Sequence, residues 1–238
     1  MSAPKIILYT NRICPWAHRA HIALQELGLP FEEVTIDLDT PREPWYLEVN
    51  PRGLVPSLSY NNEIITESGI VAQFLADAHP SHLVPPSNTP EGALQRARIA
   101  FFADTYSSKV APHYNTALRG ATAENRKAGV EALVAAIKKE IEPLLYPGLE
   151  GKTHGPFFGG SDKLTLVEVL FGSFLIRMHA FAKAEYDLLD PGLWESLAEV
   201  KNFSRWAEAT RDHPSVKAIF PETRAAERTR AKLVSVRK

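Results

Sequence analysis

The sequence predicts a two-domain protein in which an α/β domain is followed by an all-α domain. Three observations indicate this division. Short strand-like runs alternate with helical patterns in residues 1–79, four prolines interrupt residues 80–90, and only helical periodicity follows in residues 91–238. Because proline cannot continue a helix, residues 80–90 are expected to form an interdomain linker.

The first elements form a β-α-β unit. Lys5–Tyr9 is a short apolar run typical of a strand, and Pro15–Leu27 repeats alanine and leucine at helical spacing. Gly28 stands where a helix usually ends, and Phe31–Ile36 is a second run rich in strand-forming residues. Two strands connected through a helix are expected to pair in parallel.

A short helix, a turn, a hairpin and a closing helix complete the first domain. They are expected at Thr40–Val49, Asn50–Gly53, Val55–Tyr60 with Glu63–Thr66, and Ser68–Ala78. Asn61 and Asn62 separate the two hairpin runs and favour a tight turn between antiparallel strands. Ser68 precedes an apolar helical pattern, so its hydroxyl is expected to cap that helix.

Helical periodicity dominates the second domain. Helices are expected over Ile99–Val110, Val130–Ile141 and Leu197–Arg211. Pro112 is expected to end or kink the first of them. Thr165 and Glu168 have the spacing of a capping box. The helix that they open is apolar nearly all round as far as Met178, which predicts that it is buried on most sides.

Composition limits the classes of function. The chain has 238 residues, of which 45% are hydrophobic and 23% charged, and its net charge is −1. This ordinary globular balance gives no indication of a nucleic-acid or membrane partner, and no metal is expected. A single cysteine cannot form an internal disulfide, so we expect a reducing, cytoplasmic location.

Charge is distributed unevenly along the chain. Residues 1–80 contain 5 basic and 10 acidic side chains, whereas residues 223–238 contain 6 basic side chains and one acidic. A solvated C-terminal helix explains the basic segment. The alternative is a tail that packs over an active site or a partner.

Cys14 is the strongest candidate for chemistry. It follows the first strand and occupies the N-cap position of the first helix, with Pro15 in the first turn. A thiol there faces unpaired backbone N–H groups and the positive end of the helix dipole, and both favour the nucleophilic thiolate. The alternative is an inert buried cysteine. Ala17 stands where a Cys-x-x-Cys motif would place a second thiol, so a mixed disulfide on Cys14 needs an external thiol for its release.

Three segments together resemble the N-terminal domain of the omega class of glutathione transferases, which contain an active-site cysteine. They are Cys14-Pro-Trp-Ala-His-Arg19, Asn50-Pro-Arg-Gly-Leu-Val-Pro-Ser-Leu58, and Glu67-Ser68 at the start of a helix. The linker and the Thr165 capping box resemble the family's helical second domain, so the resemblance covers residues 5–215. It implies the glutathione transferase fold: a thioredoxin-like α/β domain over 1–79 and an all-α domain over 91–238.

The resemblance also implies a glutathione site. Its residues would be the catalytic Cys14 together with Pro15, Arg42, Leu54, Val55, Pro56, Glu67 and Ser68. A cis peptide bond between Val55 and Pro56 would present the Val55 backbone to the cysteinyl part of glutathione. Glu67 would accept a hydrogen bond from the γ-glutamyl ammonium, and Ser68 at a helix N-terminus would bind the γ-glutamyl carboxylate.

Other residues have weaker assignments. Arg42 is either the partner of the glycine carboxylate or a solvated charge, and Arg52 is a second candidate for the same role. His18 and Arg19 are expected to be solvated. The wall of an acceptor pocket would be formed by Phe102, Tyr106, Phe174, Arg177, His179 and Trp206, although each of these could belong to the core instead.

The implied activity is glutathione-dependent thiol–disulfide exchange through a Cys14–glutathione mixed disulfide. Thioltransferase, deglutathionylation and dehydroascorbate reduction all fit that scheme, and glutathione would be the co-substrate of a small disulfide or electrophilic acceptor. Conjugation of glutathione to electrophiles is the second hypothesis, and a non-enzymatic glutathione-binding interaction module is the third. The resemblance further implies a homodimer.

Overall fold

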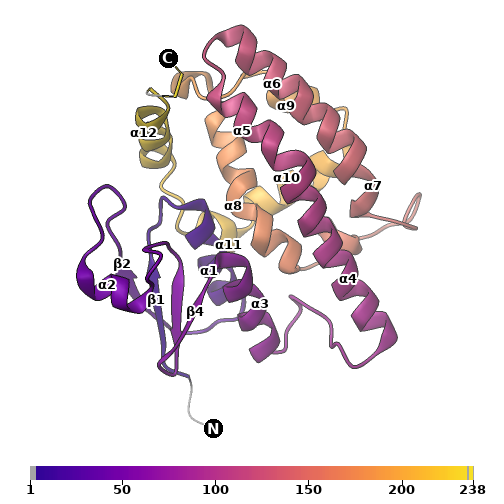
Figure 1. The fold of residues 1–238 in the computed structure, drawn as a ribbon. Coiled ribbons are helices and arrows are strands. Elements are labelled where there is room, and N and C mark those ends of the chain that lie inside the picture. The colour runs from indigo at the N-terminus through magenta and orange to yellow at the C-terminus, as the bar shows by residue number, and fades with distance from the viewer. Residues whose placement is uncertain (1–3, 235, 238) are drawn as a thin grey trace.

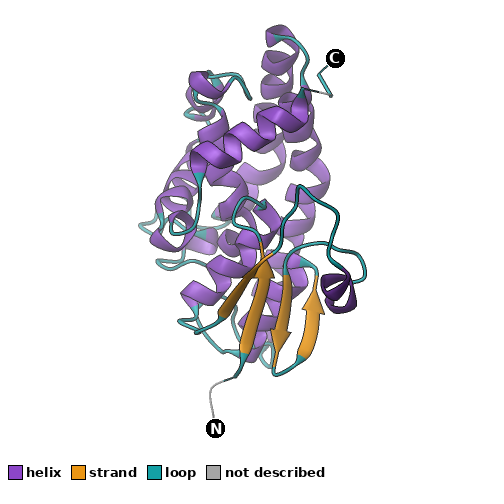
Figure 2. Cartoon of the chain, turned by 90° about the vertical axis from the view of Figure 1, so that its left-hand side faces the viewer, coloured by secondary structure: helices purple, strands orange, loops and turns teal. Residues whose placement is uncertain are grey.

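The computed structural model describes residues 4–234, 236 and 237. A four-stranded sheet with helices against it forms the N-terminal domain, and the helices of the second domain stack beside it (Figures 1 and 2). The strand order is β2-β1-β3-β4. The strands are β1 (Ile6–Thr10), β2 (Glu32–Thr35), β3 (Ser57–Tyr60) and β4 (Glu63–Thr66).

The strand pairing confirms the expected mixture of parallel and antiparallel neighbours. β1 pairs in parallel with β2 and antiparallel with β3, which pairs antiparallel with β4. Leu8 and Leu58 face each other across the central pair, and both side chains are fully buried. Asn61 and Asn62 both have positive φ, as a two-residue hairpin turn that follows the strand twist requires.

The helices in the described part of this domain are α1 (Pro15–Glu26), α2 (Pro44–Val49) and α3 (Ser68–Ala78). Gly28 follows α1 with φ of +62°, the left-handed conformation that ends helices. The prediction that Ser68 caps α3 is wrong by one residue. Glu67 is the N-cap, with φ of +69°, and Ser68 is the first helical residue. The Ser68 hydroxyl is therefore hydrogen-bonded elsewhere, to a side chain described below.

The second domain is helical, and its helices include α4 to α12. Their bounds are α4 (Pro90–Thr105), α5 (Ala111–Arg119), α6 (Ala123–Ala136), α7 (Glu142–Leu145), α8 (Leu166–Phe181), α9 (Leu193–Leu197), α10 (Lys201–Asp212), α11 (Pro214–Lys217) and α12 (Glu222–Leu233). Pro90, assigned to the linker on sequence grounds, is the first residue of α4, because its fixed φ suits a first helical position. No helix in the described part of the chain is long and apolar enough to cross a membrane.

Two long helices widen where a proline interrupts them. A π-helical turn at Tyr106–Val110 joins α4 to α5 just before Pro112, and another at Ile137–Ile141 joins α6 to α7 just before Pro143. A proline ring clashes with the carbonyl one turn earlier and lacks an N–H. A wider turn accommodates both defects, so the helix continues past Pro112 rather than ending there.

α8 lies at the centre of the domain, and its capping box is present as expected. Val167 N donates to Thr165 Oγ1 (3.2 Å), and Thr165 N donates to Glu168 Oε2 (2.6 Å). The Glu168 carboxylate is fully buried and also accepts from Phe158 N (2.9 Å) and Trp206 Nε1 (2.5 Å). Glu168 therefore fixes the start of α8 to two other segments of the domain.

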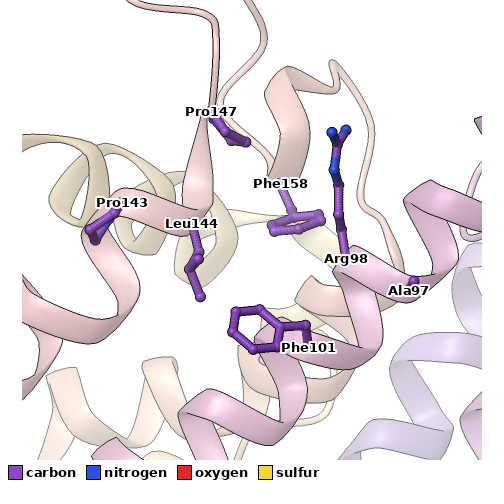
Figure 3. Close-up of a pocket in the computed structure, with 7 residues that line it drawn as sticks. All are labelled: Ala97, Arg98, Phe101, Pro143, Leu144, Pro147 and Phe158. Atoms are coloured by element: carbon purple, nitrogen blue, oxygen red, sulfur yellow. The ribbon is translucent and has the colours of Figure 1, made fainter.

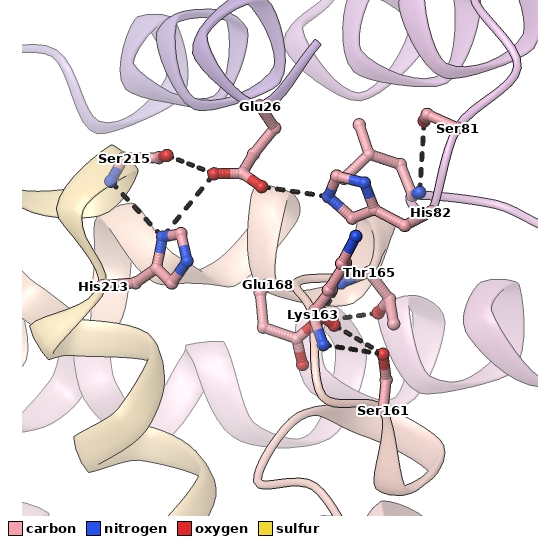
Figure 4. Close-up of polar contacts among 10 residues, drawn as sticks. Glu26, Ser81, His82, Ser161, Lys163, Thr165, Glu168, His213 and Ser215 are labelled. Atoms are coloured by element: carbon pink, nitrogen blue, oxygen red, sulfur yellow. Dashed lines mark hydrogen bonds and ion pairs between the residues drawn. The ribbon is translucent and has the colours of Figure 1, made fainter.

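The two domains are joined by polar contacts as well as by apolar packing. Glu26, at the end of α1, accepts from the Ser215 hydroxyl of α11, and its other oxygen lies 3.0 Å from His82 Nε2 in the linker (Figure 4). His213 Nδ1 lies 3.6 Å from the same carboxylate. Contacts between α1 and α8 complete this interface and bring the second domain against the loop that contains Cys14.

Candidate active site

Cys14 lies at the N-cap of α1, half-buried and at the end of the turn that follows β1. Its N–H donates to Asn11 O (2.9 Å), and its own carbonyl accepts from His18 N (3.1 Å), so the turn and the helix fix its backbone. The Cys14 thiol lies 3.9 Å from Val55 O. Pro15 begins α1 and leaves no helical N–H unpaired at that position.

Cys14 opens into a cavity of about 680 Å³. The walls are formed by Cys14, Trp16, Arg19, Leu38, Arg42, Asn50, Gly53, Leu54, Val55, Pro56, Glu67, Ser68, Gly69, Ile70 and Lys232. The cavity thus brings together all the glutathione-binding candidates except Pro15, which is not among its walls. The peptide bond between Val55 and Pro56 is cis, as the family resemblance implied.

One end of the cavity is the N-terminus of α3. Glu67 pairs there with Arg52, whose guanidinium is therefore directed at this carboxylate rather than at a separate anion site. The Ser68 hydroxyl accepts from Arg19 Nη1 (3.2 Å). Because Ser68 accepts from a cation, its own proton is free to point toward a ligand in the cavity. Carboxylates bind well at such helix ends.

The expectation that Arg19 is solvated is wrong. Its guanidinium is buried, donates to Leu170 O of α8 (2.7 Å), and lies over the rings of Trp16 (4.5 Å) and Phe174 (5.1 Å). Burial lowers the pKa of Arg19 to about 10, against the opposing effects of Tyr106 and Cys14. Arg19 therefore remains a cation at neutral pH, close to the thiol and to Ser68.

Arg42 supports the part of the cavity wall that includes Gly53. Its Nε donates to Gly53 O (2.9 Å), and its Nη1 donates to Asp37 O (2.6 Å) and Thr40 O (2.7 Å). Gly53 has φ of +61°, and a Cβ there would lie 2.9 Å from the Arg42 stem, so this crossing requires glycine. Arg42 is thus neither a simple solvated charge nor a fully available anion ligand.

Arg177 and His18 hold the Cys14 loop from behind. Arg177 is buried, and its Nη2 donates to Ile13 O (3.0 Å) and Arg12 O (3.3 Å), the two carbonyls before Cys14. Its Nη1 lies 3.0 Å from His18 Nδ1. Burial first, and then the charge of Arg177, hold the pKa of His18 well below its usual range, so Nδ1 accepts from Arg177. The predictions that His18 is solvated and that Arg177 forms a wall of the acceptor pocket are therefore wrong.

A second cavity, of about 280 Å³, adjoins the first. Trp16 and Arg19 line both cavities. Tyr106 and Phe174, expected in an acceptor pocket, line this cavity together with Trp16, Arg19, Ser107, Ala111, Tyr114, Asn115, Phe171 and Met178. Burial raises the pKa of both Tyr106 and Tyr114, so both phenols stay protonated.

The remaining pocket candidates lie elsewhere. Phe102 and Trp206 are fully buried against each other in the core, with ring centroids 5.4 Å apart. His179 contacts Arg211 on α10 (3.1 Å) and is not among the residues that line the second cavity. Helical periodicity identifies a buried face but does not say whether that face meets a cavity or another helix, which is why these three were misplaced.

A further cavity, of about 380 Å³, lies on the helical domain between α4 and the segment around α7 (Figure 3). Its walls include Phe101, Leu144 and Phe158. Cys14 is not among its walls, and of the seven residues that line it, Arg98 alone has a polar side chain. The chemistry of this chain is therefore expected at the two adjoining cavities beside Cys14.

Eight of the fifteen residues that line the cavity were not predicted from the sequence as part of the site, and they include Trp16, Arg19 and Lys232. Trp16 and Arg19 follow Cys14 closely, and their positions two and five residues after it were the available signal. Lys232 lies more than 200 residues away on α12, and nothing local in the sequence connects it to the cavity.

Comparisons with known proteins agree with this geometry. Residues 13–78 match the family model described as the N-terminal domain of glutathione S-transferase. The omega-1 glutathione S-transferase of Rattus norvegicus is 31% identical and is matched over 74% of this chain and 68% of its own length. The omega-1 enzyme of Sus scrofa is 29% identical over 92% of this chain and 82% of its own.

Solved structures extend the likeness to the whole fold. The structure of glutathione transferase Omega 1C from Trametes versicolor has a TM-score of 0.73, 26% sequence identity and 98% coverage of both chains. Omega 2C from the same organism has a TM-score of 0.73 at 27% identity. With a cysteine at the N-cap of α1, a cis-proline beside it and these relatives over nearly its full length, the chain belongs to the glutathione S-transferase family, in its omega-like, cysteine-containing class.

Proposed function

We propose that this protein is a glutathione-dependent enzyme that catalyses thiol–disulfide exchange through Cys14. The observation that carries the proposal is the position of Cys14. It is the one cysteine of the chain, lies at the N-terminus of α1, and lines a cavity whose walls include Val55, Glu67 and Ser68. These are the groups that would bind the cysteinyl and γ-glutamyl parts of glutathione.

The proposed reaction has two exchanges. The Cys14 thiolate attacks the glutathionyl sulfur of a mixed disulfide, which forms a Cys14–glutathione disulfide and releases the other sulfur as a thiolate that takes up a proton. A second glutathione thiolate then attacks the glutathione sulfur bound to Cys14. Oxidised glutathione leaves, and the Cys14 thiolate is regenerated. The second glutathione is needed because the chain contains no other thiol.

The arrangement around Cys14 supports this sequence of steps. The cations Arg19 and Arg177 are both buried near Cys14, Arg19 in the cavity wall and Arg177 behind the loop, and each has a favourable electrostatic interaction with the charge of Cys14. Both cations therefore favour negative charge on the Cys14 sulfur. The aromatic second cavity would take the part of the substrate that leaves in the first exchange, so small glutathionylated compounds fit better than large ones. Dehydroascorbate remains a further candidate.

Conjugation of glutathione to electrophiles is the second hypothesis, supported by the aromatic lining of the adjoining cavity. In that reaction glutathione itself is the nucleophile. A Cys14 thiolate disfavours a second thiolate a few ångströms away, because like charges repel each other. We therefore propose that disulfide exchange is the faster reaction. We also propose that the protein works as a homodimer in the cytoplasm.

Replacing Cys14 by serine distinguishes the two reactions. The variant is expected to lose reduction of a model glutathione mixed disulfide, because no protein thiol remains. It should retain or gain conjugation of a chlorinated aromatic, because the hydroxyl can donate to a glutathione thiolate. Both rates are measured on the same preparation, with the circular dichroism spectrum and calorimetric glutathione binding as controls for folding.

Full disulfide-exchange activity in the serine variant would contradict the role of Cys14. Parallel loss of both activities, with folding and glutathione binding intact, would equally contradict it. A wild-type protein that binds glutathione and is inactive in both assays would instead support the third hypothesis, a glutathione-binding interaction module.

A further inference from the structure

The basic C-terminal helix α12 is docked on the molecule rather than solvated on all sides. Glu222, at its start, pairs with Lys183 and accepts from Tyr186 Oη (3.2 Å). Beyond its end, Arg237 donates to Leu118 O (2.9 Å) and Leu188 O (2.7 Å) in the helical domain. The alternative of a packed tail is therefore correct for the described residues, whereas Lys238 lies outside them.

The middle of α12 contacts the N-terminal domain. Arg228 donates from Nε to Asp39 Oδ1 (2.9 Å) and Oδ2 (3.2 Å) and from Nη2 to Oδ1 (2.6 Å). Asp39 belongs to the loop between β2 and α2, which lies below α12 in Figure 1. Its neighbour Leu38 lines the cavity beside Cys14. The fork of Arg228 thus holds α12 against one rim of that cavity.

Lys232 lies one helical turn beyond Arg228, on the same face of α12. It lines the cavity together with Arg42 and Leu38. Hydrogen bonding from Arg228 chiefly, and then the charges of Lys232 and Arg224, lower the pKa of Asp39. Three cations of α12 therefore act on Asp39, whose neighbour Leu38 lines the cavity.

Charge complementarity identifies the ligand group that suits this rim. Glutathione carries two carboxylates, at its γ-glutamyl and glycine ends. The N-terminus of α3 and Ser68 suit the first. At the rim beside α12, Arg42 donates three hydrogen bonds to backbone carbonyls. A lysine, with a long flexible stem and a compact charge, can reach a carboxylate there without a fixed geometry.

We propose that Lys232 binds the glycine carboxylate of glutathione, and that Arg228 positions α12 for this contact by holding Asp39. The inference rests on the proposed glutathione cavity and adds a residue of the helical domain to it. Glutathione would then bridge the two domains, with its γ-glutamyl end on α3 and its glycine end under α12.

Calorimetry with two ligands tests this. The first is reduced glutathione, and the second is glutathione amidated at the glycine carboxylate, both in the presence of a phosphine reductant. Lys232→Met should weaken binding of glutathione about fivefold, the upper range for an exposed ion pair, and leave binding of the amide unchanged. Arg230→Met is the matched control, because Arg230 is an exposed cation on the same helix outside the cavity walls. It should change neither affinity.

Arg228→Met and Asp39→Asn test the positioning role. Each should reduce the preference for glutathione over its amide, with little effect on the amide itself, whereas general damage to the fold would weaken both ligands. Equal losses on both ligands in Lys232→Met, or no loss on either, would overturn the inference while leaving the proposed function standing. Absence of glutathione binding by the wild type would overturn both.

Discussion

Ser68 shows how a single hydroxyl at this site depends on a distant helix. Arg19 donates to Ser68 and at the same time to Leu170 O of α8, so its guanidinium fixes the hydroxyl and joins the domains. The hydroxyl can then donate its proton to an anion at the α3 N-terminus. Glu67, held in a left-handed conformation, carries its carboxylate to the same end of the cavity.

Glu67→Ala and Ser68→Ala are each expected to weaken glutathione binding by about 1–3 kcal/mol, the loss for a hydrogen bond to a charged group. Isothermal calorimetry measures this. Glu63→Ala is the control, since Glu63 is an exposed acid on β4 that does not line the cavity. Unchanged affinity in both site variants would mean that the γ-glutamyl group binds elsewhere.

At the scale of an element, the start of α8 depends on one buried carboxylate. Glu168 accepts from two backbone N–H groups, the Thr165 hydroxyl and the Trp206 indole, and all of these contacts are inside the protein. Burial raises the pKa of Glu168 above its usual range although four donors face it. Any side chain that cannot accept all four bonds leaves buried donors without partners.

Glu168→Gln is therefore expected to destabilise the protein by about 2–4 kcal/mol, because its amide N–H₂ would face donors rather than accept from them. Urea unfolding at pH 7 gives the free energy of unfolding directly. Glu208→Gln on the exposed face of α10 removes the same charge and should change stability by less than about 0.5 kcal/mol. A Glu168→Gln protein as stable as the wild type would refute the structural role of this carboxylate.

At the scale of the whole molecule, some large apolar side chains are exposed and are candidates for the interface of the proposed homodimer. Ile64 on β4 and Leu94 and Phe101 on α4 are each more than 40% exposed, and the two α4 residues share one helix face. The opposite net charges of residues 1–80 and of the rest of the chain are compatible with one domain facing the other domain of a second copy.

Light scattering at micromolar concentration is expected to give a mass of about 53 kDa, twice the 26.4 kDa of one chain. Leu94→Glu with Phe101→Glu should shift the mass toward the monomer, because burying two carboxylates in an apolar interface is unfavourable. Glu91→Gln, also on α4, serves as a control variant that leaves these side chains in place. A wild-type monomer at that concentration would contradict the proposed homodimer.

Local sequence patterns were enough to predict the elements of the first domain and the place of Cys14. Strand runs, the asparagine turn, Gly28 and the Thr165–Glu168 box all depend on interactions between residues a few positions apart, which local patterns record. The N-cap position of Cys14 follows from such a pattern too. The N-cap of α3 was misplaced because the conformation of Glu67 and the partner of Ser68 depend on packing.

The side chains that surround the thiol depend on tertiary packing, which local patterns do not record. Arg19 and His18 read as surface residues in α1, yet the packing of α8 on α1 buries both, and Arg177 reaches the Cys14 loop from residues more than 160 positions away. Packing within the helical domain places Phe102 and Trp206 in the core, and the docking of α12 on Asp39 brings Lys232 to the cavity. Burial depends on contacts between segments distant in the chain, and helical periodicity contains no information about which segments meet.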